Sequence, residues 1–409
     1  MRKLLFIDTS YNFSEITKRN SLNVILSRDL NSYFNKVISV HPVANLTNKR
    51  LFLDTSYYKK NIINQNHIFY EFSSGKKNKI VIFEYISFLL SQIKMIFFLI
   101  QIIKKEKINY IKCGDINYSG IIALILSKIT RVSFYARVGS NNNKIRDEIK
   151  KPLQPKFFKK IFIEKYFENL ILKNCKHVFP ANNDNANFVK SYLDNHNNIT
   201  VIRYGYLIND CHFVERKIRK LTDNLLIGFK NNQNLIVSCI SRFEEVKKVD
   251  HVISVFSELF KHNQKTILVL VGDGSLKKHY QDMVHDFKIS DYVYFMGDKN
   301  QNWIAELLSI TNLVLSPHTG RALCEAALAG CNIVGYDIDW QSEIITHKLS
   351  GFLANYGNKE KLIYYAKEIL TNQSKYENFA VNIRKKALMI LDKNKNIADE
   401  VNVFNNENS

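Results

Sequence analysis

The sequence predicts an α/β protein made of two Rossmann-like domains that face each other across a cleft. At 409 residues, the chain is long enough to form two hydrophobic cores. In both halves, short apolar runs that end in polar or glycine-containing loops alternate with longer amphipathic stretches, which is the rhythm of parallel strands joined by helices. A polar stretch at 207–232 interrupts this rhythm and is expected to link the two domains.

The composition is that of a globular protein, with 46% hydrophobic and 12% aromatic residues. The six cysteines are scattered and form no Cys-x-x-Cys pair, which favours free thiols in a reducing compartment over disulfides or a zinc site. The first apolar run is only four residues long, at 4–7. Because this is too short for a signal peptide, we expect a first strand there and a cytoplasmic protein.

Positive charge is concentrated in the first half of the chain. The net charge is +20, and residues 1–200 hold 32 Lys/Arg against 14 Asp/Glu, whereas residues 201–409 hold 26 against 24. A face with this bias attracts nucleic acid, an anionic membrane or acidic substrates. Nucleic acid is the weakest of these, because the basic half lacks the aromatic signature of an RNA-recognition sheet.

The first domain is expected to span residues 1–206. Its predicted strands are 3–8, 36–41, 108–113, 132–137, 177–180 and 199–205, and its predicted helices include 21–34, 119–129 and 157–172. Asp115 and Arg137 stand where two of these strands end, at the edge of a parallel sheet where ligands bind. We expect both to bind a ligand, and ordinary loop hydrogen bonds are the alternative.

Two stretches of this half are candidates for a membrane surface. Residues 80–103 are very apolar, but the longest unbroken apolar run, 95–100, is far shorter than a membrane span. We expect a mostly buried helix there, with an interfacial membrane helix as the second reading. The helix at 157–172 is amphipathic and basic, which suits the inner face of an anionic cell membrane. Its expected buried face is Phe158, Ile161, Phe162, Tyr166 and Leu170, and its expected polar face is Lys159, Lys160, Glu164, Lys165 and Glu168.

The second domain is expected to span residues 233–372, with strands at 235–240, 266–271, 292–295, 313–315 and 332–336. Its most informative stretch follows the fourth strand, which stops at Pro317, turns through Thr319 and Gly320, and enters a short helix. Such a turn offers free backbone N–H groups to a phosphate. Glu325 lies about one turn inside the helix, where its carboxylate can reach a sugar hydroxyl.

Five ordered motifs of this half resemble the nucleotide-sugar-binding domain of family 4 glycosyltransferases, which have the GT-B fold. They are Ser241-Arg242-Phe243 with Lys247, Gly272-Asp273-Gly274, Phe295-Met296-Gly297, Ser316-Pro317 with Glu325-Ala326 and Gly330-Cys331-Asn332-Ile333-Val334, and Glu343. Their order and spacing are more specific than any one of them. The resemblance covers about residues 235–355, and the first half shares only the strand–helix rhythm and a likeness at 201–205.

The resemblance implies a retaining hexosyltransferase that moves a sugar from a nucleotide-diphosphate donor to a saccharide or lipid-linked acceptor. The ligand expected at Asp115 and Arg137 of the first domain is then the acceptor. The resemblance gives the catalytic role to Arg242 and Lys247, because fixed cations stabilise the charge that grows on the leaving diphosphate. Surface charges without that role are the alternative. The donor-binding residues that it implies are Gly272, Asp273, Gly297, Asp298, Lys299, His318, Thr319, Gly320, Arg321, Ala322, Leu323 and Glu325.

The sequence departs from the family at one position. The first glutamate of the family's Glu-x7-Glu pair falls at Pro317, so contacts to the donor sugar must differ, and His318, Thr319 or Arg321 can take its place. No spacing of His, Cys or Asp residues predicts a metal site, since the Asp337-Ile338-Asp339 segment follows the last strand, away from the expected phosphates. We expect metal-independent activity, with no cofactor beyond the donor.

As in the family, a helix within 373–395 is expected to cross back to the first domain, ahead of a loose polar tail at 396–409. With the basic first domain, this predicts a peripheral membrane enzyme of cell-surface polysaccharide or lipopolysaccharide biosynthesis. Two alternatives remain open. A nucleotide-sugar 2-epimerase of the same fold would turn over the donor without an acceptor, and a non-catalytic GT-B scaffold is conceivable because of Pro317.

Overall fold

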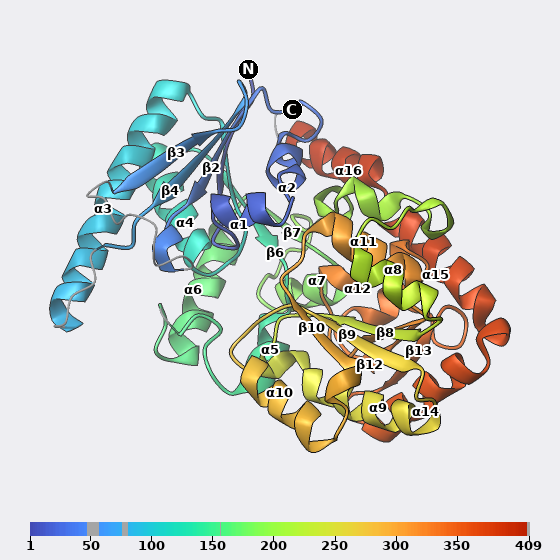
Figure 1. The fold of residues 1–409 in the computed structure, drawn as a ribbon. Coiled ribbons are helices and arrows are strands. Elements are labelled where there is room, and N and C mark those ends of the chain that lie inside the picture. The colour runs from blue at the N-terminus through green and yellow to red at the C-terminus, as the bar shows by residue number, and fades with distance from the viewer. Residues whose placement is uncertain (47–56, 76–80, 156, 407–409) are drawn as a thin grey trace. The chain divides into compact units, whose positions relative to one another are not determined.

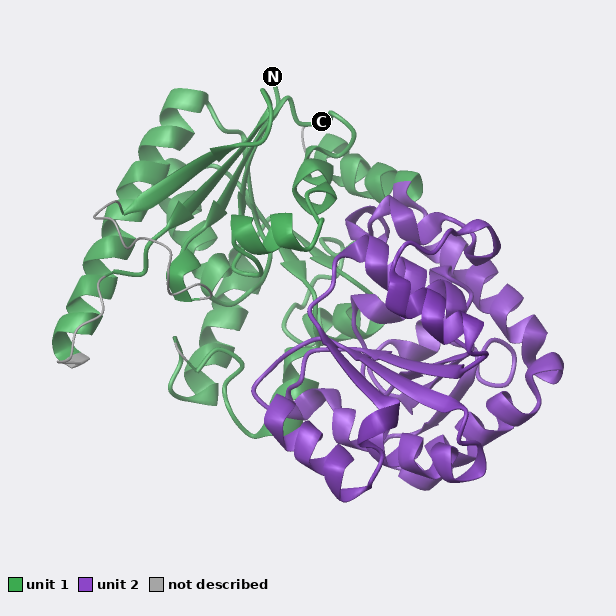
Figure 2. Cartoon of the chain, in the orientation of Figure 1, with its two compact units in different colours: residues 1–203, 394–409 green, residues 204–393 purple. Residues whose placement is uncertain are grey.

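The computed structural model describes residues 1–46, 57–75, 81–155 and 157–406, which form two compact units. Unit 1 comprises residues 1–203 and 394–409, and unit 2 comprises residues 204–393 (Figure 2). Each unit is an α/β structure with a largely parallel sheet, which confirms the predicted fold class (Figure 1).

Unit 1 is built on a seven-stranded sheet in the order β3-β4-β2-β1-β5-β6-β7, parallel except for the edge strand β3. The central strands are buried on both faces because helices cover both sides of the sheet (Figure 1). The strands are β1 (Lys3–Ile7), β2 (Lys36–His41), β3 (Tyr58–Ile62), β4 (His67–Phe72), β5 (Tyr110–Cys113), β6 (Phe134–Val138) and β7 (His177–Pro180). The helices are α1 (Phe13–Lys18), α2 (Asn23–Leu26), α3 (Val81–Glu106), α4 (Tyr118–Thr130), α5 (Asn142–Ile149), α6 (Ile161–Asn174), α7 (Asn183–Lys190) and α16 (Lys393–Asn406).

Unit 2 is built on a fully parallel six-stranded sheet in the order β10-β9-β8-β11-β12-β13. Its strands are β8 (Leu235–Ile240), β9 (Thr266–Val271), β10 (Val293–Gly297), β11 (Leu313–Ser316), β12 (Ile333–Asp337) and β13 (Phe352–Asn355). Its helices are α8 (Asn224–Asn231), α9 (Val249–His262), α10 (Lys277–Asp286), α11 (Gln301–Ile310), α12 (Arg321–Leu328), α13 (Gln341–Ile344), α14 (Lys359–Thr371) and α15 (Glu377–Ile390).

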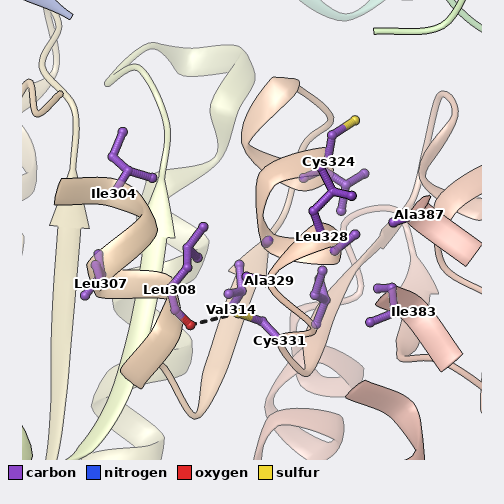
Figure 3. Close-up of a cluster of buried hydrophobic side chains, with 14 of the residues drawn as sticks. Ile304, Leu307, Leu308, Val314, Cys324, Leu328, Ala329, Cys331, Ile383 and Ala387 are labelled. Atoms are coloured by element: carbon purple, nitrogen blue, oxygen red, sulfur yellow. Dashed lines mark hydrogen bonds between the residues drawn. The ribbon is translucent and has the colours of Figure 1, made fainter. Parts of the chain in front are cut away.

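Helix α12 is held in place by its apolar side. Cys324 and Leu328 lie in a buried cluster with Leu308 of α11 and Ile383 of α15 (Figure 3). The Cys331 Sγ that follows the helix donates to the Leu308 carbonyl oxygen at 3.3 Å. This packing fixes the position of α12, whose N-terminus follows β11.

The predicted linker at 207–232 is part of unit 2. It contains the 3-10 helices Asp210–Phe213 and Arg216–Ile218 as well as α8, and it begins where a third 3-10 helix, Gly205–Leu207, ends. Ile208, Leu226 and Phe229 are buried in the unit 2 core. The stretch reads as polar because only a few apolar side chains anchor it.

The chain returns to unit 1 through α16, because α15 belongs to unit 2 and residues 396–406 are helical instead of a loose tail. Phe404 is fully buried, and its ring lies 5.3 Å from those of Phe34 and Tyr110. Glu400 forms a buried ion pair with Lys112 of β5. Because these contacts depend on two side chains in a polar segment, composition did not reveal them.

Two shorter predictions also change. The helix predicted at 21–34 is only α2 followed by a 3-10 turn, since residues 30–32 have positive φ angles that a helix does not accommodate. The strand predicted at 199–205 is reduced to an isolated parallel bridge between Ile199 and Val178. The antiparallel pair of β3 and β4 was not predicted.

Helix α3 is not mostly buried as predicted. Only 22% of the most apolar 18-residue window of Ile82–Glu106 is buried, and this stretch is long and apolar enough to cross a membrane by length and composition. Met95, Leu99 and Ile103 pack in the core of unit 1, whereas eight apolar side chains between Ile82 and Phe97 are 41–64% exposed.

The predicted faces of α6 are wrong in part, although Phe158 is buried and Lys159, Lys160 and Lys165 are exposed as expected. Glu164 and Glu168 point inward and are fully buried, because both pair with Arg146 of α5 at 2.6–3.0 Å. Phe162 and Tyr166, which were expected inside, are exposed. An arginine outside the helix therefore buries two acidic residues that periodicity assigns to solvent.

Candidate functional site

The predicted donor residues of unit 2 follow the carboxyl ends of four adjacent strands. The loops after β8, β9, β10 and β11 begin at residues 241, 272, 298 and 317, respectively. The strands are parallel, so all four loops open at one edge of the sheet, which is where α/β proteins bind ligands.

Lys247 joins the loop after β8 to the loop after β11. Its Nζ donates to the Thr319 carbonyl oxygen at 2.9 Å and lies 3.1 Å from His318 Nδ1. Thr319 Oγ1 in turn donates to Asp339 Oδ2 at 2.7 Å, and His318 Nε2 lies 3.8 Å from the same oxygen. The structure thus brings Lys247, His318 and Thr319 together as a nearly buried cluster.

Asp339 was not a candidate, because its segment was expected to lie away from the site. The backbone of Asp339 adopts a positive φ of 52° after β12, and its carboxylate reaches Thr319. A polar residue shortly after an apolar strand was the available clue in the sequence.

Arg242 occupies a more open position than Lys247. Its side chain is 66% exposed, and its Nη1 lies 3.3 Å from Glu244 Oε1 on the same loop. The predicted pair of cations therefore consists of one residue fixed between loops and one at the surface.

Two glycines let the loops after β8 and β9 approach closely. A Cβ at Gly272 would lie 1.9 Å from the Ser241 carbonyl oxygen, and a Cβ at Gly274 would lie 2.4 Å from the Phe243 carbonyl oxygen. Gly272 also has a φ of +136°, which side chains disfavour. Between them, the Asp273 carboxylate accepts from the Gly274 amide at 2.8 Å and from Lys277 Nζ at 3.0 Å.

We expect Gly272→Ala to lower the free energy of unfolding by about 2–4 kcal/mol, since a new Cβ meets backbone at a strained φ. Urea denaturation measures this change. Gly228→Ala is the matched control, because a Cβ there meets nothing within 4 Å and the helix gains about 1 kcal/mol in propensity. Equal unfolding midpoints for the two variants would contradict the close approach.

The start of α12 has unengaged backbone donors. Among the described residues, the amides of Gly320, Arg321 and Ala322 have no hydrogen-bond partner. A Cβ built on Gly320 meets no atom within 4 Å, so the space beside it is open. Leu323 is buried, so only its backbone could face a ligand. The partial positive charge of the helix end favours an anion here.

Glu325 is 2% exposed and is therefore not a solvated surface residue. Its Oε1 lies 3.2 Å from Arg321 Nε and 3.9 Å from His212 Nε2, but it has no hydrogen-bond partner among the described residues. His212 Nε2 also lies 2.9 Å from Gln301 Oε1. Burial lowers the pKa of His212, so its imidazole is neutral at pH 7. His212 and Gln301 were missed because they come from distant, unremarkable segments.

The loop after β10 contributes fewer fixed groups. Gly297 has a φ of +63°, which permits the turn, and Asp298 is exposed. Lys299 Nζ lies 4.8 Å from the centre of the Trp303 ring. Within the ranges that the structure describes, no group of three or more His, Cys, Asp or Glu residues could hold a metal ion.

Unit 1 holds the two predicted acceptor residues in different surroundings. Asp115 accepts from Thr9 Oγ1 at 3.0 Å and from the Asn117 amide at 2.8 Å, and burial raises the pKa of its carboxyl. Arg137 is buried within β6 and donates to the Ile202 carbonyl oxygen at 3.4 Å. Their role in acceptor binding stays a prediction.

Further polar groups gather where β1 and β2 end. Arg28 donates to Asp8 Oδ2 at 2.8 Å, and Ser10 Oγ donates to Asp8 Oδ1 at 2.7 Å. A Cβ at Gly114 would lie 2.9 Å from the same Asp8 oxygen, so this glycine makes room for the carboxylate. His41 is fully buried nearby, and burial lowers its pKa to about 4. These residues were not candidates, although polar residues at strand ends mark them.

Residues 227–386 match the family model described as Glycosyl transferases group 1. The chain is similar to N-acetyl-alpha-D-glucosaminyl L-malate synthase of Bacillus anthracis, with 27% identity over 161 residues, which cover 38% of this chain and 41% of that protein. It is also similar to alpha-monoglucosyldiacylglycerol synthase of Streptococcus pneumoniae, with 22% identity over 131 residues, 31% of this chain and 30% of that protein. The matched part spans less than half the length of either curated relative.

The whole chain is similar in fold to Anabaena HepE, whose crystal structure is in complex with UDP-glucose. The TM-score is 0.70 at 17% identity, and the match covers 98% of this chain and 100% of that chain. An identity this low shows the fold alone. Such neighbours are GT-B glycosyltransferases, which confirms the predicted GT-B fold, while the finer placement in family 4 stays a prediction.

Proposed function

We propose that this protein is a glycosyltransferase, because residues 227–386 match the family model described as Glycosyl transferases group 1. It moves a sugar from a nucleotide-diphosphate donor to a saccharide or lipid-linked acceptor. The observation that carries the proposal is the position of Lys247, which contacts the loop that leads into the unengaged amides of α12. A cation and a helix start on one side of an open space suit a diphosphate.

The residues of unit 2 have separable roles in this proposal. Lys247 and the amides of residues 320–322 stabilise the negative charge that develops on the diphosphate as the glycosidic bond breaks. Arg242, whose side chain is exposed in the structure, supplies a second cation to the phosphates of the nucleotide sugar. Glu325 accepts hydrogen bonds from the ribose hydroxyls, a role supported by its buried and unsatisfied Oε1.

The donor proposed first is a UDP-hexose, supported by the bound UDP-glucose of Anabaena HepE. We also propose transfer with retention, in which a leaving phosphate oxygen takes the proton of the acceptor hydroxyl. Retention follows from the family resemblance, and analysis of the product's anomeric configuration by NMR tests it. The pathway that we propose is cell-surface polysaccharide or lipopolysaccharide biosynthesis, in which both saccharide and lipid-linked acceptors occur. A lipid-linked acceptor is supported by the relative alpha-monoglucosyldiacylglycerol synthase, which is named for a lipid product.

A thermal-shift screen with UDP-, GDP-, CMP- and dTDP-sugars tests the donor site. A nucleotide at 100 times its Kd stabilises the wild type by about 2.7 kcal/mol. We expect Glu325→Gln to lose about 1–3 kcal/mol of this gain, because an amide replaces the charged acceptor of the ribose hydroxyls. Glu377→Gln, at an exposed glutamate of α15, is the matched control and should shift as the wild type does.

Each negative outcome has a distinct meaning. An equal shift for Glu325→Gln and the wild type would remove Glu325 from the nucleotide site. Failure of every nucleotide sugar to stabilise the wild type would contradict the donor proposal itself. If the protein converts the donor to its 2-epimer without an acceptor, the protein is an epimerase and not a transferase.

A further inference from the structure

Helix α3 has apolar side chains on two different faces. Met95, Leu99 and Ile103, spaced by four residues, pack in the unit 1 core. A second stripe faces away from the core and is made of Ile82, Ile86, Leu89, Leu90, Ile93 and Phe97. At 3.6 residues per turn, these six side chains lie on one side of the helix and do not overlap with the buried stripe. Apolar residues scattered singly over a surface need no explanation, but a continuous stripe of this length does.

The two halves of α3 differ in how firmly the sheet holds them. None of the described side chains from Ile82 to Ser91 is buried, whereas the core-packed positions begin at Gln92. The first half carries one charged residue, Glu84, and the helix ends in Lys104 and Lys105. If α3 left unit 1 to span a bilayer, the core of unit 1 would be exposed, because the second half of the helix packs there.

A basic and aromatic surface lies on the neighbouring helix layer. Lys159, Lys160, Phe162, Lys165 and Tyr166 are all exposed around the start of α6. Tyr118 of α4 links the two helices, since the centre of its ring lies 4.1 Å from that of Phe157, which precedes α6, and 6.2 Å from that of Phe88 of α3. Figure 1 shows α3, α4 and α6 as neighbours within unit 1.

We propose that the outward face of α3 docks on an anionic lipid bilayer, lying in its interface while the lysines at the start of α6 contact the lipid head groups. An interfacial helix combines an immersed apolar face with nearby Lys and Arg residues, as found here. The excess of positive charge in residues 1–200 favours anionic lipid. A second copy of this chain fits the surface less well, because a symmetric contact would bring the same lysines together. This proposal does not depend on the donor chemistry of unit 2.

Flotation of the full-length protein with vesicles tests the docking. We expect the wild type to bind vesicles of 30% phosphatidylglycerol in phosphatidylcholine and to bind pure phosphatidylcholine at least tenfold more weakly. Ile86→Gln with Leu89→Gln and Ile93→Gln should weaken binding to the anionic vesicles at least tenfold, since glutamine preserves helix propensity and removes the apolar face. Phe287→Gln with Leu349→Gln and Val381→Gln changes three exposed apolar side chains of unit 2 and is the matched control.

Two further variants distinguish insertion of α3 into the bilayer from electrostatic attraction of the α6 lysines to its surface. Phe97→Trp places a fluorophore on the outward face, and we expect its emission to shift to the blue and to be quenched by brominated lipid. Lys159→Glu with Lys160→Glu and Lys165→Glu should reduce the preference for anionic over neutral vesicles.

Several results would overturn the proposal. Unchanged vesicle binding by the α3 triple variant would do so, as would Phe97→Trp emission that does not respond to vesicles. A wild type that dimerises and ignores vesicles, with a monomeric triple variant, would assign the face to a second copy. The UDP-induced thermal shift should be the same in the wild type and the triple variant, so loss of docking and loss of donor binding are read separately.

Discussion

Lys247→Ala is expected to lower kcat for sugar transfer by about 10²–10³-fold while the protein stays folded. The ammonium group of Lys247 is fixed by the Thr319 carbonyl oxygen at 2.9 Å, beside the start of α12, so it needs no reorganisation when charge develops on the diphosphate. Arg242→Ala should have a smaller effect that falls mainly on KM, because the Arg242 side chain is exposed and must move to reach the phosphates.

Steady-state kinetics with the donor identified by thermal shift, together with an acceptor mixture, measures both effects. Lys278→Ala is the matched control, because Lys278 is exposed and pairs with Asp282 on the same helix. A kcat for Lys247→Ala within threefold of the wild type would remove Lys247 from catalysis. Lys247→Arg separates charge from position, since arginine keeps the charge but places it on a planar fork.

The second large effect is on stability. Arg146→Met is expected to lower the free energy of unfolding by about 3–5 kcal/mol, because it leaves two buried carboxylates without their cation. Arg146 Nη1 lies 3.0 Å from Glu164 Oε2, and its Nη2 lies 2.6 Å from Glu168 Oε2. Asn142 Nδ2 also donates to Glu168 at 2.6 Å and the Leu153 amide donates to Glu164 at 3.1 Å, so the carboxylates cannot turn outward without breaking further bonds.

Urea denaturation at neutral pH measures the loss. Lys144→Met serves as the control, because the Lys144 side chain is half exposed and its pair with Asp184 should contribute no more than about 1 kcal/mol. Adding Glu164→Gln and Glu168→Gln to Arg146→Met should restore part of the stability, since neutral amides are less costly to bury than unpaired charges. A loss below about 1 kcal/mol for Arg146→Met would contradict a cluster that depends on its charge balance.

The residues of the candidate site in unit 2 could be proposed from the sequence because they lie in short motifs that follow apolar strands. Gly272 follows an apolar strand directly and Gly320 follows one after three residues, and the short range of a strand–turn–helix unit is visible in sequence. The family resemblance placed both Lys247 and Thr319 in the donor site, but it did not predict the contact between them, which spans 72 residues. Parallel strands before both loops bring the two residues to one edge of the sheet. Asp339 was missed since its position depends on a left-handed turn that no local pattern specified.

The faces of the helices in unit 1 were less predictable, for a common reason. Periodicity assigns the acidic residues of α6 to solvent. Their burial depends on Arg146, which lies outside the helix and pairs with them. The exposure of α3 could not be read either, because both of its stripes are apolar and sequence does not say which one meets the sheet. In each case the missing information is the identity of the partner.

The return of α16 to unit 1 has a consequence for how the chain folds during synthesis. Unit 2 is one continuous segment and can fold as soon as it is made, but unit 1 needs its last helix, which emerges after residues 204–393. At about 5–20 residues per second, the ring cluster around Phe404 and the buried Lys112 stay uncovered for roughly 10–40 seconds. The last segment of unit 1 is therefore added only after the whole of unit 2 has been synthesised.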